Sequence, residues 1–235
     1  MSKVKRILSV IMAMVMVLAM SVPTFAATTP TANDTAKGTV QNVEKAATVT
    51  AYQITKAQYD GGFIGYVKTD NKLAIADVLA PTSDEVTAIA KQIASGAVTL
   101  KSKTMTGAAV ADDVKYTDFT ADLNAGYWLV IVSGTVDEVY NPMLVGVYYS
   151  ANGSDNTMTS NPVNADSNWT LETSNAYAKS TTPSIKKEIV GGETAKGNDV
   201  AIGDTVNFKI TTAIPSYSKQ YNTVTVAISD TMSAG

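Results

Sequence analysis

Short segments rich in β-branched and aromatic residues, separated by turn residues, constrain the fold of this chain more than any other feature. Before residue 151 these segments are Val43–Ile54, Phe63–Val67, Ala97–Leu100, Gly126–Val132 and Met143–Tyr149. Gly, Asn, Asp and Ser gather between them, as they do in the tight turns that join antiparallel strands. The pattern predicts a mainly β protein that begins with a sandwich of about a hundred residues.

One helix is expected inside this β pattern. Its apolar residues have the i, i+3, i+4, i+7 spacing of an amphipathic helix and are Val86, Ile89, Ala90 and Ile93. Thr82 and Glu85 have the spacing of a capping box at its start, and Gly96 is a stop signal at its end. The sequence therefore predicts a helical insertion between strands of the first domain.

Residues 1–26 have the organisation of a secretory signal peptide. Lys3, Lys5 and Arg6 precede an apolar run that is short for a membrane span, and we expect cleavage after Ala26. Removal of these three cations and of no acid moves the formal net charge from −3 to −6, which disfavours nucleic acid as a partner. Residues 27–38 are small and polar, and we expect them to form a flexible tail.

The chain contains no cysteine and no histidine. Disulfide bonds, Ser-His catalytic pairs and metal sites built from Cys or His are therefore excluded. A group of acidic residues lacks the order of a calcium-binding loop, and we expect them to be solvated loop acids. They are Asp112, Asp113, Asp118 and Asp122. No cofactor is expected.

The rest of the chain divides into three parts. Residues 39–168 are expected to form the first sandwich, residues 169–182 a strand and a linker, and residues 183–235 a second β domain. The strands expected in the second domain are Ile185–Val190, Thr205–Ala213 and Thr223–Ser229. Three strands do not close a sandwich, so we expect this domain to be incomplete in the sequence.

Four short motifs in and after the linker carry a resemblance to a known family. They are Trp169 with Tyr177-Ala178-Lys179, then Ile185–Val190, Ile202–Thr211 and Ile228–Gly235. In this order and spacing they resemble the sortase-assembled shaft pilins of Gram-positive bacteria, which form internal isopeptide bonds. The family's pilin motif is W-x-x-x-V-x-V-Y-P-K. Here the spacing from Trp to Lys is one residue longer, the two valines are missing, and Ala178 replaces the proline.

Two other parts of the family pattern are absent from the sequence. The L-P-x-T-G sorting signal is missing, which favours an N-terminal fragment of a longer protein. The acid box Y-x-L-x-E-T is not evident after Gly126–Val130, where Ile131 and Val132 stand in place of an acid. We therefore expect no internal bond in the first domain.

The resemblance implies tandem Ig-like β-sandwich domains and a structural subunit of a covalent pilus at the cell wall. A sortase would hold the C-terminal threonine of a neighbouring subunit as a thioester, and the amine of Lys179 would attack it. Trp169 and Tyr177 would fix the strand so that the lysine projects outward. The alternative is a solvated linker lysine beside two aromatic residues that pack at the domain edge. Lys45 and Lys56 are interpreted as surface lysines.

For the complete second domain, the resemblance implies one autocatalytic bond between a buried lysine and an asparagine carboxamide. Lys187 is the expected amine, because strand alternation places it with Ile185 and Ile189 on the core face. Asp230 is the expected acid that polarises the carboxamide and shuttles protons, and its alternative role is a turn aspartate. The asparagine would lie beyond Gly235.

The partners expected from the resemblance are pilin subunits of the same kind, a sortase and ligands on a host surface. The protein is not expected to be a turnover enzyme. One alternative is an ancillary or tip pilin, or a surface adhesin, of the same assembly. A second is a secreted carbohydrate-active enzyme, which would need a pair of catalytic carboxylates that the sequence does not show.

Overall fold

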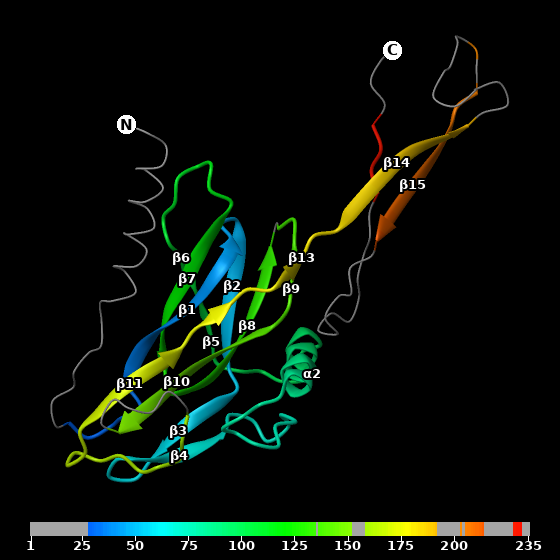
Figure 1. Cartoon of the computed structure of the whole chain (residues 1–235). Helices are drawn as coiled ribbons and strands as arrows, with labels where there is room; N and C mark the ends of the chain where they lie inside the picture. Colours follow the sequence, from blue (N-terminus) through cyan, green and yellow to red (C-terminus); the bar gives the residue numbers. More distant parts are fainter. Residues whose placement is uncertain are drawn as a thin grey trace, which may run out of the picture.

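Two β-sheets pack face to face in the first part of the chain (Figure 1). The computed structural model describes residues 28–134, 136–151, 158–191, 203, 205–213 and 228–231. The first sheet has the order β12-β1-β7-β6. Its strands are β1 (Thr35–Glu44), β6 (Thr106–Gly107), β7 (Tyr116–Asn124) and β12 (Ala176–Tyr177). The second sheet has the order β11-β10-β8-β2-β5. Its strands are β2 (Ala47–Gln53), β5 (Ser102–Thr104), β8 (Gly126–Gly134), β10 (Met143–Ala151) and β11 (Trp169–Ser174).

Three short ladders complete the described strands. They are β3 (Thr55–Tyr59) with β4 (Phe63–Lys68), β9 (Val139–Tyr140) with β13 (Ser180–Thr181), and β14 (Ser184–Gly191) with β15 (Asn207–Ala213). The pairing of β1 with β12 is parallel, and the other described pairs are antiparallel. The predicted mainly β fold is therefore confirmed.

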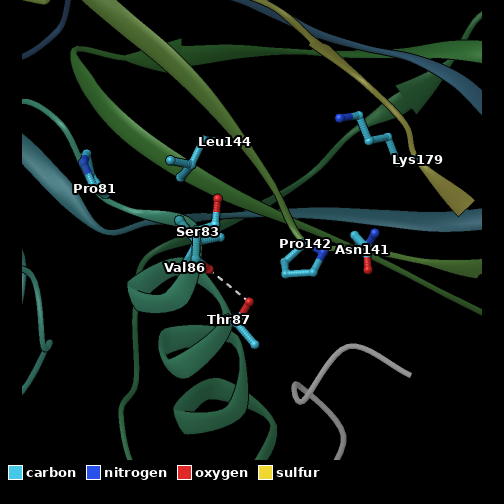
Figure 2. Close-up of a pocket in the computed structure, with 8 residues that line it drawn as sticks. All are labelled: Pro81, Ser83, Val86, Thr87, Asn141, Pro142, Leu144 and Lys179. Carbon is cyan, nitrogen blue, oxygen red and sulfur yellow. Dashed lines mark hydrogen bonds between the residues drawn. The ribbon is translucent and has the colours of Figure 1, made fainter. Parts of the chain in front are cut away.

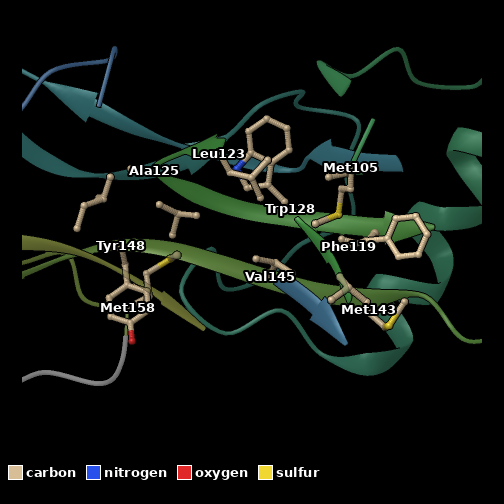
Figure 3. Close-up of a cluster of buried hydrophobic side chains, with 14 of the residues drawn as sticks. Met105, Phe119, Leu123, Ala125, Trp128, Met143, Val145, Tyr148 and Met158 are labelled. Atoms are coloured by element: carbon tan, nitrogen blue, oxygen red, sulfur yellow. The ribbon is translucent and has the colours of Figure 1, made fainter. Parts of the chain in front are cut away.

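Strand β8 is buried on both faces of the second sheet. Trp128 and Val130 are fully buried and belong to the cluster between the two sheets. Figure 3 shows Trp128 in this cluster together with Phe119 and Val145. The alternate residue Leu129 is also fully buried, but it packs in a second cluster on the opposite face of the sheet. A strand buried on both faces needs a nearly continuous apolar run, which is what the segment Gly126–Val132 provides.

The second cluster is closed by the predicted helix, α2 (Ser83–Ala94). Its buried residues Val86, Ile89 and Ala90 pack with Leu129. The capping box is confirmed: the Glu85 amide donates to Thr82 Oγ1 at 3.3 Å, and the Thr82 amide donates to Glu85 Oε2 at 2.7 Å. The apolar contacts with Leu129 hold the helix against β8, and the capping box stabilises its N-terminal end. No helix among the described residues has the length and apolarity to span a bilayer.

The chain before the first sheet is held by residues from distant strands. Thr35–Gly38, which we expected in a flexible tail, instead form the start of β1. Upstream of β1, Trp169 Nε1 donates to the Thr28 carbonyl at 2.8 Å, and the Tyr149 hydroxyl donates to Asp34 Oδ2 at 3.0 Å. These partners are more than a hundred residues away in the sequence, so the local composition could not indicate them.

Two other strand predictions differ from the structure. Val43–Ile54 was expected to be one strand, but the turn at residues 45–46 divides it between β1 and β2. The strand expected at Ala97–Leu100 is wrong: β5 begins only at Ser102, and the buried Val98 packs instead in the cluster under the helix. The strand expected at Thr223–Ser229 lies mostly outside the described residues. Trp169–Tyr177 add a strand to each sheet of the first sandwich, because β11 pairs with β10 and β12 pairs with β1.

Candidate functional site

Lys179 lies between two short strands that fasten its backbone to the first sandwich. On the N-terminal side, β12 pairs with β1, and the Ala178 amide donates to the Gln41 carbonyl at 2.9 Å. On the C-terminal side, β13 pairs with β9, and the Asn141 amide donates to the carbonyl of Lys179 itself at 3.0 Å. The backbone of this lysine is therefore held on both sides.

The side chain of Lys179 borders a surface cavity of ≈ 420 Å³. Figure 2 shows Lys179 on one side of this cavity and the first turn of α2 on the other. The cavity is lined by Pro81, Ser83, Val86, Thr87, Asn141, Pro142, Leu144 and Lys179. Lys179 is exposed, and it belongs to none of the ion pairs among the described residues. Its amine is therefore accessible at the edge of a concave surface.

The two predicted aromatic anchors have different environments. Trp169 is buried, packs edge-to-face against Tyr149 at a centroid distance of 5.2 Å, and donates to the Thr28 carbonyl. The Tyr177 side chain is 63% exposed. The segment next to Lys179 is held instead by the backbone pairing of β12 and by Ala178, which is buried. Ala178 occupies the position where the pilin motif has proline.

A buried carboxylate lies directly behind the strand that follows Lys179. Ser180 Oγ donates to Glu138 Oε2 at 2.6 Å, and the hydroxyl of Tyr116 donates to Glu138 Oε1. The amine of Lys115 lies 3.3 Å from the same oxygen and 2.8 Å from Glu44 Oε1. Both glutamates are less than a tenth exposed. These residues form a polar cluster that joins β1, the start of β7, the segment before β9, and β13.

The electrostatics of the cluster follow from these contacts. Burial alone raises the pKa of Glu138, but the hydrogen bonds from Ser180, Tyr116 and Lys115 outweigh it and hold that pKa below the usual range. The hydrogen bond to Glu44 is the largest cause that raises the pKa of Lys115. The carboxylate of Glu138 and the ammonium of Lys115 are therefore the stable forms at neutral pH.

The cluster should make the first domain less stable in acid. Below the usual glutamate pKa of about 4.3, Glu138 is protonated in the unfolded protein but still ionised in the folded protein, because its folded pKa is lowered. The unfolded state then binds more protons, so the free energy of unfolding falls as the pH falls toward the folded pKa. We expect Glu138→Gln to flatten the fall of the melting temperature between pH 6 and pH 3. Glu172→Gln, on β11, is the control for the loss of one carboxylate and should keep the wild-type slope. An unchanged slope in Glu138→Gln would contradict the assignment.

This cluster was not predicted from the sequence. One signal was available in the sequence. Glu138 is two residues before the aromatic Tyr140, so in an extended segment both side chains point to the same side, which is the buried side here. Its partners Glu44, Lys115 and Ser180 are too far away in the sequence for any local pattern to connect them.

The predicted pair in the second domain is brought together. Lys187 Nζ lies 2.8 Å from Asp230 Oδ1 and 2.7 Å from Oδ2, and it lies 4.5 Å from the centroid of the Phe208 ring. Ile189 is directly opposite Phe208 across the β14–β15 ladder, so Lys187 shares the apolar face of this ladder. Lys186 pairs with Glu188 on the other face. Among the described residues this site is open, because the Lys187 and Asp230 side chains are 35% and 42% exposed.

The other lysines singled out by the sequence have surface positions. Lys45 donates to the Asp112 carbonyl at 2.6 Å, and Lys56 is exposed on β3. In the first domain, Lys101 donates to Asn124 Oδ1 at 2.9 Å in an exposed contact. Within the described part of the chain, no cluster of three His, Cys, Asp or Glu side chains is suited to hold a metal ion.

Comparisons with known proteins agree on one relationship. Residues 33–180 match the sequence profile of the T6 antigen Ig-like domain. The trypsin-resistant surface T6 protein of Streptococcus pyogenes serotype M6 is 30% identical over 208 residues, which cover 86% of this chain and 37% of that protein. The T6 backbone pilin of serotype M6 Streptococcus pyogenes, a modular three-domain structure, matches with a TM-score of 0.60 and 27% identity. That match covers 81% of this chain and 38% of the pilin, so the chain spans less than half the length of these relatives.

Proposed function

This chain belongs to the T6 antigen Ig-like domain family, and on that premise we propose that it is a structural subunit of a covalently polymerised cell-surface pilus. The observation that supports this role best is the accessible amine of Lys179 on a segment whose backbone is fixed on both sides. The structural relative is itself a backbone pilin. The predicted signal peptide, which lies outside the described residues, fits export to the cell surface.

In the proposed reaction a sortase carries the C-terminal threonine of a neighbouring subunit as a thioester. The amine of Lys179, after loss of its proton to a base or to water, attacks the thioester carbonyl carbon. The new C–N amide bond forms, the C–S bond breaks, and the enzyme's thiolate leaves. The structural requirement on this chain is an amine that the enzyme can approach, and the open cavity beside Lys179 supplies the space.

The experiment that tests this function is incubation of the full-length secreted protein, including its sorting signal, with the pilus sortase of its own bacterium. We expect a ladder of covalent multimers, and peptide mapping of the ladder should find the Lys179 side chain joined to a C-terminal threonine. A ladder joined through another lysine would keep the function and refute the site. The absence of any ladder would refute the function.

The Lys187–Asp230 contact supports a second proposed reaction, which occurs once in each molecule of the complete protein. The amine of Lys187 attacks the carboxamide carbon of an asparagine in the same domain, the N–C bond forms, the bond to the amide nitrogen breaks, and ammonia leaves. Asp230, within 2.8 Å of the amine, can accept its proton and, once protonated, donate to the departing nitrogen. This single event makes a cross-link and does not make the protein a turnover enzyme.

The mass of the complete protein tests this second reaction. The wild-type protein should be lighter than its sequence mass by one ammonia for this bond, and Asp230→Ala should remove that deficit because the proton carrier is lost. Lys186→Ala, on the opposite face of β14, is the matched control and should keep the deficit. A deficit that persists in both Asp230→Ala and Lys187→Ala would show that the bond lies elsewhere.

A further inference from the structure

The residue that follows Lys179 connects the acceptor segment to the polar cluster of the first domain. Ser180 Oγ donates to Glu138 Oε2 at 2.6 Å, and β13, which contains Ser180, is a strand of only two residues. A ladder of this length has few backbone hydrogen bonds, so a side-chain bond to a charged acceptor contributes a large share of its stability.

The contact between Ser180 and Glu138 also affects the direction in which the Lys179 side chain points. Successive side chains of an extended segment point to opposite sides. Here Ala178 is buried and Lys179 is exposed, and Ser180, although it is also exposed, directs its Oγ to the buried Glu138. Because the buried Ala178 and the bond from Ser180 to Glu138 hold the segment on both sides of Lys179, its own side chain is directed toward the cavity that it lines.

The carboxylate that receives Ser180 is itself rigidly held. Tyr116 and Lys115 occupy its other oxygen, and Glu44, on the far side of Lys115, accepts the Asp137 amide at 2.8 Å. Glu138 therefore cannot turn away from Ser180 without giving up the hydrogen bond from Tyr116. A fixed acceptor restricts the geometry of its donor far more than a solvated side chain would.

We propose that Glu138 is a positioning residue that, through Ser180, holds the segment of Lys179 in the orientation presented to the sortase. This inference rests on the proposed acceptor role of Lys179. Glu138 takes no part in the bond exchange and does not touch the reacting atoms. When the Ser180 contact is lost, β13 separates from β9 more often, and only the docked fraction of molecules presents the lysine correctly.

Loss of the Ser180 contact is expected to change KM and not kcat. If the docked state alone binds the acyl-enzyme, the apparent affinity falls in proportion to the docked fraction, while bound molecules react as before. Loss of a hydrogen bond to a charged group shifts such an equilibrium by roughly tenfold. With the docked and undocked states similarly populated in the wild-type protein, as a ladder of two residues allows, a tenfold shift lowers the docked fraction about three- to sixfold. We therefore expect Ser180→Ala to raise the KM for this protein as acceptor by about that factor and to leave kcat unchanged.

The experiment uses the secreted protein, its sortase and a fluorescent donor peptide that carries the L-P-x-T-G signal. Ser180→Ala is compared with Ser180→Thr, which keeps the hydroxyl and should restore the wild-type KM, and with Thr181→Ala as a neighbouring control in β13. Glu138→Gln should raise KM in the same direction. Hydrogen exchange gives a second readout: the Asn141 amide, which is bonded to the Lys179 carbonyl, should exchange faster in Ser180→Ala, whereas the Ala178 amide should not.

The outcomes separate this inference from the function on which it rests. If the wild-type protein accepts no donor peptide on Lys179, the proposed function fails. If it does accept the peptide but Ser180→Ala has the wild-type KM, or if Ser180→Thr is as impaired as Ser180→Ala, the positioning role is refuted. Faster exchange at Asn141 with an unchanged KM would also refute it, because the contact would then stabilise β13 without affecting the acceptor.

Discussion

Lys179→Arg is expected to abolish the sortase-dependent ladder. Arginine keeps the positive charge and most of the length of lysine, so the cavity, β12 and β13 should be preserved. Its guanidinium remains protonated at all accessible pH values and supplies no free amine to attack a thioester. The loss of polymer would therefore be a chemical effect on the nucleophile, and the melting temperature should remain at the wild-type value.

Two other lysines provide matched controls for this substitution. Lys45 and Lys56 are exposed residues of the same domain, and Lys56→Arg and Lys45→Arg should polymerise like the wild-type protein. The measurement is the yield of multimers at a fixed time, with peptide mapping of any residual product. A normal ladder from Lys179→Arg would show that another amine is the acceptor and would contradict the site assignment.

Parts of the fold that depend on local patterns could be predicted from the sequence. The capping box of Thr82 and Glu85 formed as expected, and the apolar run of β8 proved to be a central strand of the second sheet. Parity along Ile185–Ile189 predicted that Lys187 lies on the core face of the second domain, and this stays a prediction because Ile185 and Ile189 are 61% and 36% exposed among the described residues. In each case the signal lies within a few residues, where spacing alone determines which side chains meet.

Features that depend on distant partners could not be predicted in this way. The Ser180–Glu138 bond joins residues separated by 42 positions, and the Trp169–Thr28 bond joins residues separated by 141. Strand β7 was missed although its buried residues Thr117, Phe119 and Leu123 share one parity, because acids and small residues interrupt the apolar signal. Composition also could not show that Tyr177 is exposed while the small Ala178 is buried. Tertiary contacts decided all of these.

The substitution Gly126→Ala should have the largest effect on stability in the first domain. Gly126, the first residue of β8, has φ +136°, which side-chain-bearing residues rarely adopt. A Cβ atom here would lie 2.0 Å from the Thr55 carbonyl oxygen and 2.7 Å from its carbonyl carbon. Since backbone atoms cannot move aside as a flexible side chain can, either β3 or β8 must shift. That shift would disturb the hydrogen bond from the Tyr127 amide to Thr55 Oγ1.

Gly96→Ala separates this steric effect from backbone strain. Gly96 also has a positive φ, +71°, but no atom lies within 4 Å of the position of an added Cβ. Gly96→Ala should therefore cost only the left-handed strain of about 1–2 kcal/mol, whereas Gly126→Ala should cost more than about 4 kcal/mol or prevent folding. Urea unfolding of the two variants measures the difference. Equal costs would mean that β3 and β8 yield easily. A much larger cost for Gly126→Ala would instead show that the close approach of β3 and β8 at Gly126 is rigid. That contact would then support the second sheet, against which α2 packs and beside which the cavity of Lys179 lies.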